Sequence, residues 1–198
     1  KVWLVAASLF FYAYWDVKYL PLILGSIAMN FAIGTGLSRT HDRGLSEPSA
    51  RTINRKLVLA AGITANLLLL GYYKYTDFMV ANLNAMLETS YALPHIVLPL
   101  AISFFTFTQI VYLVDSYRGE THEYDLLNYS LFVTFFPHLI AGPIVHHRQI
   151  MPQFASRWTL TVRHSNIAKG LFIFSIGLFK KVVIADTFSI WADAGFDG

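Results

Sequence analysis

The sequence contains no cysteine and has few charged residues. Without cysteine, the 198 residues can hold no disulfide, no thiolate nucleophile and no cysteine-ligated zinc. Charged residues make up 14% of the chain, whereas soluble domains carry about 25%. Hydrophobic residues make up 55%, and the mean hydropathy is +0.48. This composition excludes a disordered chain, argues against a soluble globular domain and predicts an all-α polytopic membrane protein.

The motifs of several soluble enzyme classes are also absent. The chain has no zinc-protease histidine pair, no Gly-x-Ser-x-Gly elbow, no P-loop and no dinucleotide-binding glycine pattern. No histidine is followed by an aspartate at the spacing of soluble-type glycerolipid acyltransferases. The net charge is +3, but the basic residues lie in short loops between apolar runs, which argues against nucleic-acid binding. We therefore expect no nucleic-acid partner and no metal site.

Six apolar runs divide the chain into candidate membrane segments. A nineteen-residue run rises about 28 Å as a helix, close to the bilayer core thickness of about 30 Å. The first run rises only about 20 Å, so we expect it to be truncated at its start or to lie partly in the interface. We assign all six runs to one membrane domain, residues 1–198, and expect it to be part of a longer protein. The runs cover residues 2–14, 19–37, 57–73, 96–114, 129–145 and 167–185.

The distribution of basic residues predicts an orientation. Residues 38–56 contain five Lys or Arg residues, which places this connection in the cytoplasm. A complete crossing by the fifth run would then put the basic residues that follow it outside. A segment that enters the membrane and turns back removes this conflict, and Pro137, Gly142 and Pro143 favour such a break. A proline-kinked helix that spans the membrane is the alternative, and the sequence leaves both open.

Histidines near this break are the first candidates for chemistry. His138 follows Pro137 inside an apolar run, and residues that titrate near neutrality usually face a cavity at such positions. The alternative, which we favour, is a neutral histidine bonded to a carbonyl that Pro137 frees, because His138 has no visible catalytic partner. His146, His147 and Arg148 end the run, where we expect them at the membrane interface. Contact with a phosphate or carboxylate is the alternative for these three.

Polar residues recur along the fourth run. Ser103, Thr106 and Gln109 are spaced by three, so they form one side of a helix. Helix packing is the ordinary explanation, and lining a substrate passage is the alternative. The charged residues at 115–125 are interpreted as a solvated loop. The lysines at 180–181 are expected to extend to the interface, with attraction of an anionic cytoplasmic donor as the alternative.

Four phrases resemble the membrane-bound O-acyltransferase (MBOAT) family. Phe136-Pro137-His138-Leu139-Ile140-Ala141-Gly142-Pro143-Ile144 looks like the Phe-Pro-x-Leu-Ile-Ala-Gly-Pro-Ile signature of a bacterial branch. That branch contains the alginate O-acetylation membrane subunit and the teichoic-acid D-alanylation subunit. The three further phrases are residues 98–107, 112–119 and 177–186. All four occur in the family's order, so together they make the resemblance specific.

This resemblance implies the amino-terminal part of a ring of tilted helices around a thin funnel, in the bacterial inner membrane. An acyl group would pass through the funnel from a cytoplasmic donor to an acceptor. The family's essential histidine lies in a later Trp-His-Gly phrase that this sequence lacks, so we assign no catalytic residue and expect that histidine beyond Gly198. His138 occupies the variable position of the signature. Candidates for the funnel or re-entrant segment are Pro137, His138, Gly142 and Pro143.

The alginate-like branch further implies acetyl-CoA as the acyl donor, no bound cofactor, and a periplasmic acetyltransferase partner that modifies an exopolysaccharide. The teichoic-acid-like branch would use a D-alanyl carrier protein instead, and the phrase at 139–143 favours the first branch. A transporter or channel subunit is the alternative from another class, but we find none of the inverted repeats that mark many transporters. A structural subunit without catalysis is a third interpretation.

Overall fold

The computed structural model describes residues 1–44, 49–121, 123, 125–140, 142, 145–156 and 161–196, without the side chains at 42–44, 49–53 and 196. Within these ranges the chain is helical and contains no strand, which confirms the predicted all-α fold. Two compact units, residues 1–155 and 156–198, are considered separately. The first unit contains α1 (Val2–Trp15), a 3-10 turn (Val17–Tyr19), α2 (Leu20–Gly44), α3 (Ser49–Leu87), α4 (Ile102–Arg118), α5 (Leu126–Thr134), α6 (Phe136–Leu139) and α7 (His147–Ala155).

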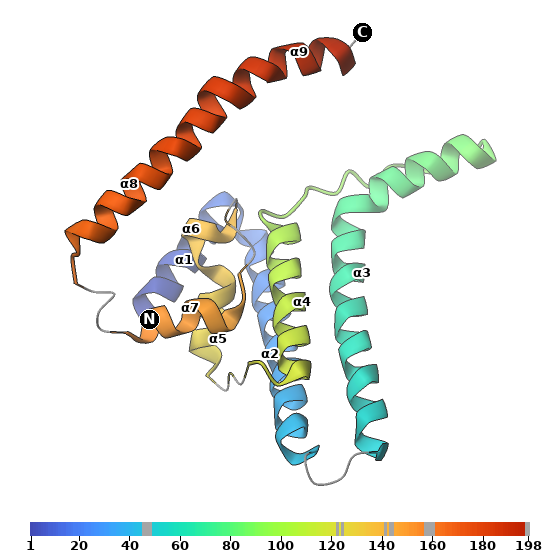
Figure 1. Ribbon diagram of the computed structural model, residues 1–198. Helices are drawn as coiled ribbons and strands as arrows, with labels where there is room; N and C mark the ends of the chain where they lie inside the picture. Colours follow the sequence, from blue (N-terminus) through green and yellow to red (C-terminus); the bar gives the residue numbers. More distant parts are fainter. Residues whose placement is uncertain are drawn as a thin grey trace. The chain divides into compact units, whose positions relative to one another are not determined.

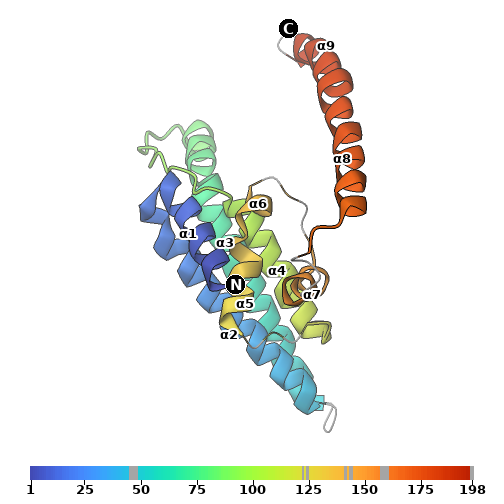
Figure 2. The same ribbon diagram turned by 90° about the vertical axis from the view of Figure 1, so that its left-hand side faces the viewer.

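Three long helices form the centre of the first unit. Helices α2, α3 and α4 pack side by side, as both views show (Figures 1 and 2). Helix α1 packs on α5 and α6, and α7 packs on α5. Aromatic side chains fill the junction between these groups: Tyr112 of α4 and Tyr129 of α5 are fully buried, with ring centroids 4.4 Å apart. Helix α5, which forms the first part of the fifth apolar run, is therefore packed into the helical bundle.

The fourth run forms a helix with different bounds from those predicted. We predicted residues 96–114, but α4 runs from Ile102 to Arg118. Pro99 disfavours helical backbone in the residue before it, and Ala101 has a φ of +56°, so the helix begins only after these residues. At its other end α4 continues to Gly119, whose φ of +74° is typical of the residue that ends a helix. Asp115 consequently belongs to the helix rather than to the loop after it.

Two stretches in the described part of the chain are long and apolar enough to cross a membrane. They are Val17–His41 and Asn54–Leu87, which overlap the predicted runs 19–37 and 57–73. The second stretch is longer than its run because α3 continues to Leu87, and Figure 1 shows its last part bending aside. Large apolar side chains on this helix are exposed, among them Leu68 at 68%. Acyl chains would cover such side chains in a bilayer.

The second unit is a helical stretch without a core of its own. It contains α8 (His164–Phe179), a π-helical turn (Lys180–Ala185) and α9 (Asp186–Phe196). The predicted run 167–185 lies in α8 and the π-helical turn. Within residues 161–195, every side chain is exposed except that of Asp186, which is half-buried. Lys181 pairs with Asp186 at the π-helical turn. That the two units form one membrane domain stays a prediction.

Candidate functional site

The fifth apolar run is broken in the middle. Helix α5 has nine residues, so it rises only about 13 Å, less than half the thickness of a bilayer core. It ends at Phe135, whose ψ of 101° is not helical, and the four-residue α6 follows. Pro137 lies at the start of α6, where its missing amide hydrogen leaves no hydrogen bond unmade. The proline therefore starts a new short helix and does not kink a continuous one.

Gly142 closes the chain tightly after α6. Its amide nitrogen donates to the carbonyl oxygen of His138, 3.0 Å away. A Cβ at this position would lie 2.7 Å from that oxygen and 2.5 Å from the Cα of His138. These are backbone atoms, so they cannot turn away as a flexible side chain would, and only glycine fits without a shift of the chain. Pro143, the last of the predicted residues of this segment, lies outside the described residues.

His138 is buried among aromatic rings. It is 9% exposed, and its ring centroid lies 5.7 Å from that of Phe104 and 5.3 Å from that of Phe135. Neither ring nitrogen has a hydrogen-bond partner in another residue that the structure describes. The imidazole thus makes no hydrogen bond to the freed carbonyl that we considered as its partner, within the described residues. Aromatic packing is the interaction that holds this imidazole.

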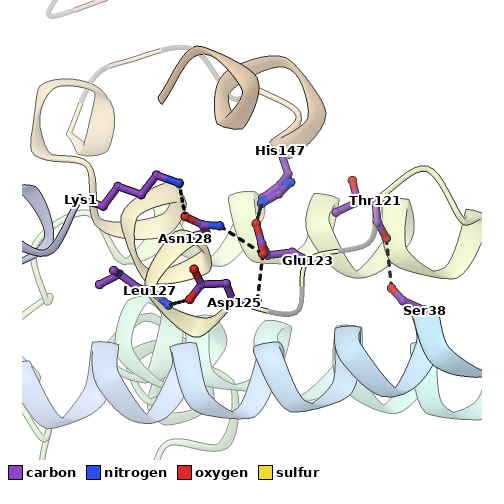
Figure 3. A network of polar contacts seen from close by, with 8 residues as sticks. All are labelled: Lys1, Ser38, Thr121, Glu123, Asp125, Leu127, Asn128 and His147. Carbon is purple, nitrogen blue, oxygen red and sulfur yellow. Dashed lines mark hydrogen bonds and ion pairs between the residues drawn. The ribbon is translucent and has the colours of Figure 1, made fainter. Parts of the chain in front are cut away.

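A network of polar contacts joins the two ends of the broken run. The Nε2 atom of His147, at the start of α7, lies 3.1 Å from Oε2 of Glu123, just before α5 (Figure 3). The other carboxylate oxygen of Glu123 accepts from the amide of Asp125 at 2.9 Å and from Nδ2 of Asn128 at 3.5 Å. Lys1 Nζ donates to the side-chain oxygen of Asn128 at 2.8 Å. The chain therefore enters α5 and returns to α7 at the same place, which is the path of a segment that turns back.

Two further ion pairs join the same stretches of chain. His146 Nδ1 lies 2.8 Å from Oδ2 of Asp115, and Arg148 Nη1 lies 3.0 Å from Oε2 of Glu120. The three consecutive residues at 146–148 thus each meet a carboxylate from the end of α4 or the loop after it. Each of the three residues therefore contacts a carboxylate of the protein itself. Their expected position at the membrane interface stays a prediction.

The interpretation of residues 115–125 as a solvated loop was wrong for two of its acidic residues. Asp115 is 1% exposed and Glu123 is 8% exposed. Burial by itself raises the pKa of Glu123, but hydrogen bonds from His147, the Asp125 amide and Asn128, together with the charge of His147, outweigh it and the pKa is lowered. The carboxylate therefore stays ionised inside the fold. The burial of these carboxylates could not be predicted from the sequence, because an acidic stretch has the same composition whether or not basic residues from another element pack against it.

The three polar residues predicted along α4 lie in different surroundings. Ser103 lines a shallow cavity of about 330 Å³ together with Pro99, Phe107 and Ile140. Thr106 is buried, and its hydroxyl has no hydrogen-bond partner among the described residues. Gln109 is fully buried between helices. The cavity that Ser103 lines includes neither Thr106 nor Gln109 among its described lining residues.

Gln109 belongs to a buried amide network that links the three central helices. Its Oε1 atom accepts from Ser26 Oγ at 3.1 Å and from Asn30 Nδ2, both on α2. Asn30 and Asn66 of α3 exchange two hydrogen bonds, at 3.1 and 2.6 Å. Sequence reasoning missed Asn30 and Asn66, although one amide in each of three apolar runs is the signal of interhelical hydrogen bonding in membranes. This network supports helix packing as the role of Gln109.

No metal centre is evident in the described ranges, where no three His, Cys, Asp or Glu side chains gather closely enough to hold an ion. The candidate site is therefore the broken segment α5–α6–α7, with its buried histidine and its carboxylate partners. Ion pairs from residues 146–148 to carboxylates before α5 and the tight backbone at Gly142 hold this segment in place.

Comparisons with known proteins agree with this membrane architecture. The family model described as "MBOAT, membrane-bound O-acyltransferase family" matches residues 9–197. The chain is 47% identical, over its whole length and 40% of the relative's, to the Peptidoglycan O-acetyltransferase of Helicobacter pylori. It is 39% identical, over 98% of its length and 36% of the relative's, to the Probable alginate O-acetylase AlgI of Pseudomonas aeruginosa. The chain thus spans about two fifths of the length of these relatives. No solved structure matches it.

Proposed function

Because the chain belongs to the membrane-bound O-acyltransferase family, we propose that it forms part of an enzyme that transfers acetyl groups to a polysaccharide of the cell envelope. The observation that carries this proposal is the 47% identity, over the whole chain, to a peptidoglycan O-acetyltransferase. The alginate O-acetylases support the same chemistry at lower identity. The sequence resemblance favoured an alginate-like exopolysaccharide as acceptor, but the identities make peptidoglycan the first candidate and an exopolysaccharide the second.

The proposed reaction is an acetyl transfer from a thioester to a hydroxyl group. With acetyl-CoA as donor, the bond from the carbonyl carbon to sulfur breaks, a bond to the acceptor oxygen forms, and the hydroxyl proton leaves with the CoA thiol. The donor is large and charged, so it stays on the cytoplasmic side, while the polymer lies on the other side of a bacterial inner membrane. A periplasmic acetyltransferase would complete the transfer to the polymer.

The described residues would serve this reaction as part of the wall of the acyl path. Helices α2, α3 and α4 supply a rigid bundle, and the segment α5–α6–α7 turns back against it. Non-helical backbone at membrane depth is tolerated only where protein or a cavity satisfies its polar groups, so a broken segment beside a passage fits an acyl path. We assign no catalytic base to these residues.

Labelled acetyl-CoA tests the proposed function. Inverted membrane vesicles that contain the full-length protein and its native partners would receive acetyl-CoA with the label in the acetyl group. We expect alkali-labile acetate on peptidoglycan, and none in vesicles from a strain that lacks the gene. Label on an exopolysaccharide alone would select the second acceptor. Label on neither polymer would overturn the acetyltransferase assignment, and transfer only from a D-alanyl carrier protein would replace it with the D-alanylation branch.

His138→Gln is expected to retain most of this transfer activity. The imidazole makes no hydrogen bond to another described residue, and glutamine has a similar length, so the change removes mainly aromatic packing. Loss of a general acid or base would cost about 10²- to 10⁴-fold in rate, which the vesicle assay resolves easily. An immunoblot of the membranes controls for insertion. A nearly inactive variant at normal membrane levels would show that His138 takes part in the chemistry.

A further inference from the structure

We propose that α2 and α3 bind an anionic phospholipid in a pocket between their charged ends. The pocket has a volume of about 290 Å³ and is lined by Gly36, Leu37 and Thr40 of α2 and by Asn54, Arg55 and Val58 of α3. Ligand pockets measure about 300–1,000 Å³, so this one holds a part of a lipid, such as one stretch of acyl chain. Nothing in the proposed acetyl transfer requires this site.

The position of the pocket places it at the membrane boundary. The apolar run of α2 ends at Leu37 and that of α3 begins at Leu57, and the lining residues lie around these two ends. Basic residues flank both ends, so the pocket lies where the headgroups of a bilayer are expected. The basic residues around it predict that this end faces the cytoplasm. Anionic lipids give the cytoplasmic leaflet its negative surface potential, which attracts basic residues near the membrane.

The walls of the pocket suit a hydrocarbon chain. The carbon atoms of Leu37 and Val58 face it, and the hydroxyl of Thr40 is occupied by hydrogen bonds to the carbonyl oxygens of Gly36 and Leu37, at 2.8 and 3.0 Å. Asn54 and Arg55 supply the N–H donors of the lining, and the rest of the wall is apolar. A phospholipid offers such a lining both an anionic and an apolar part, whereas a free phosphate ion offers only the first.

Arg55 supplies the charge that selects an anionic headgroup. Its Nη2 atom donates to the carbonyl oxygen of Tyr117 at the end of α4, and its guanidinium lies 4.8 Å from the centre of the Tyr117 ring. Its buried Nε has no partner among the described residues, which also offer it no carboxylate. A guanidinium has five N–H donors, so Arg55 can keep Tyr117 and still bind a phosphate. Residues 38–56 contain five Lys or Arg residues against two acidic ones, so the charge at this end is net positive.

The carboxylates near the end of α4 do not compete for Arg55. Asp115 pairs with His146, and Glu120 pairs with Arg148. Lys56 lies next to Arg55 in α3 and is exposed, so it adds positive charge at the same boundary. A lipid bound through Arg55 would connect α2, α3 and the end of α4, because Arg55 already holds Tyr117.

Lipid binding to the purified full-length protein tests the proposal. Native mass spectrometry in detergent would compare phosphatidylglycerol with phosphatidylcholine of the same acyl chains. We expect phosphatidylglycerol to bind more tightly at one site. Arg55→Gln should weaken its binding about fivefold, the equivalent of about 1 kcal/mol for one basic residue near an anionic surface. Val58→Trp should weaken binding of both lipids, because the indole fills the pocket while Arg55 is kept.

Lys74→Gln is the matched control. Lys74 is another α3 cation over an aromatic ring, 5.6 Å from the centre of Tyr75, but it lies away from the pocket. The Lys74→Gln variant should therefore bind phosphatidylglycerol as tightly as the wild type. If Arg55→Gln does not fold, Val58→Trp alone decides the outcome. Equal binding of the two lipids, wild-type binding by Val58→Trp, or displacement of phosphatidylglycerol by inorganic phosphate would each overturn the lipid site.

Discussion

Glu123→Ala is expected to destabilise the protein by about 3 kcal/mol, since removing one member of a buried ion pair leaves the other without compensation. The side chains of Glu123 and His147 are 11% and 8% exposed, and the Glu123 carboxylate also accepts a hydrogen bond from the amide of Asp125. Its loss would release α7 from the start of α5. The effect is measured as the change in melting temperature of the full-length protein in detergent. Samples are heated to a series of temperatures, and the remaining folded protein is quantified by size-exclusion chromatography.

Glu120→Ala is the matched control for this change. Glu120 also pairs with a basic residue of the 146–148 stretch, but the two side chains are 32% and 55% exposed. Exposed ion pairs contribute about 0–1 kcal/mol, so the melting temperature should hardly change. Equal effects of the two alanine substitutions would show that burial does not distinguish the two carboxylates.

The Glu123 carboxylate also predicts a dependence of stability on pH. The fold lowers the pKa of Glu123 below its ordinary value of 4.5, so the ionised form stabilises the folded state. This contribution is fully present above pH 4.5 and is lost as the pH falls through the lower pKa of the folded state. Glu123→Gln removes the titration, so its melting temperature should fall less than that of the wild type over the same acid range. Parallel pH profiles would contradict the assignment.

Gly142→Ala is expected to destabilise the broken segment by up to about 3 kcal/mol, the usual upper range for an added methyl group in a packed site. The new Cβ would lie 2.7 Å from the carbonyl oxygen of His138, and the 3.0 Å hydrogen bond from Gly142 to that oxygen holds it close. The chain after α6 would have to move. Melting temperature and the vesicle assay should both decline.

Gly71→Ala is the control for Gly142→Ala. Gly71 lies inside α3, and nothing lies within 4 Å of a Cβ added there. Alanine is favoured over glycine inside a helix by about 1 kcal/mol, so this variant should be as stable as the wild type or more so. A normal melting temperature for Gly142→Ala would mean that the backbone after α6 can open without cost, against the tight closure described here.

The sequence by itself determined the class of the protein and the location of its break. Long apolar runs, low charge and the absence of cysteine predict a helical membrane protein, because the bilayer imposes length and polarity on each segment independently of its neighbours. Pro137 and Gly142 marked the break for a similar reason, since the backbone restrictions of proline and glycine are local. The phrase around them also carried the family resemblance that the comparisons confirm.

Only the tertiary structure decided which polar residues meet. The acidic residues after α4 suggested a solvated loop, yet Asp115 and His146, 31 positions apart, form a pair with a buried carboxylate. Asn30 contacts Asn66 and Gln109, which lie 36 and 79 positions away. The apolar composition of a run implies that its few polar side chains must find hydrogen-bond partners. Composition and periodicity do not reveal which residue of another run is the partner of each. Partner choice depends on how separate helices pack, and that packing is a property of the whole fold.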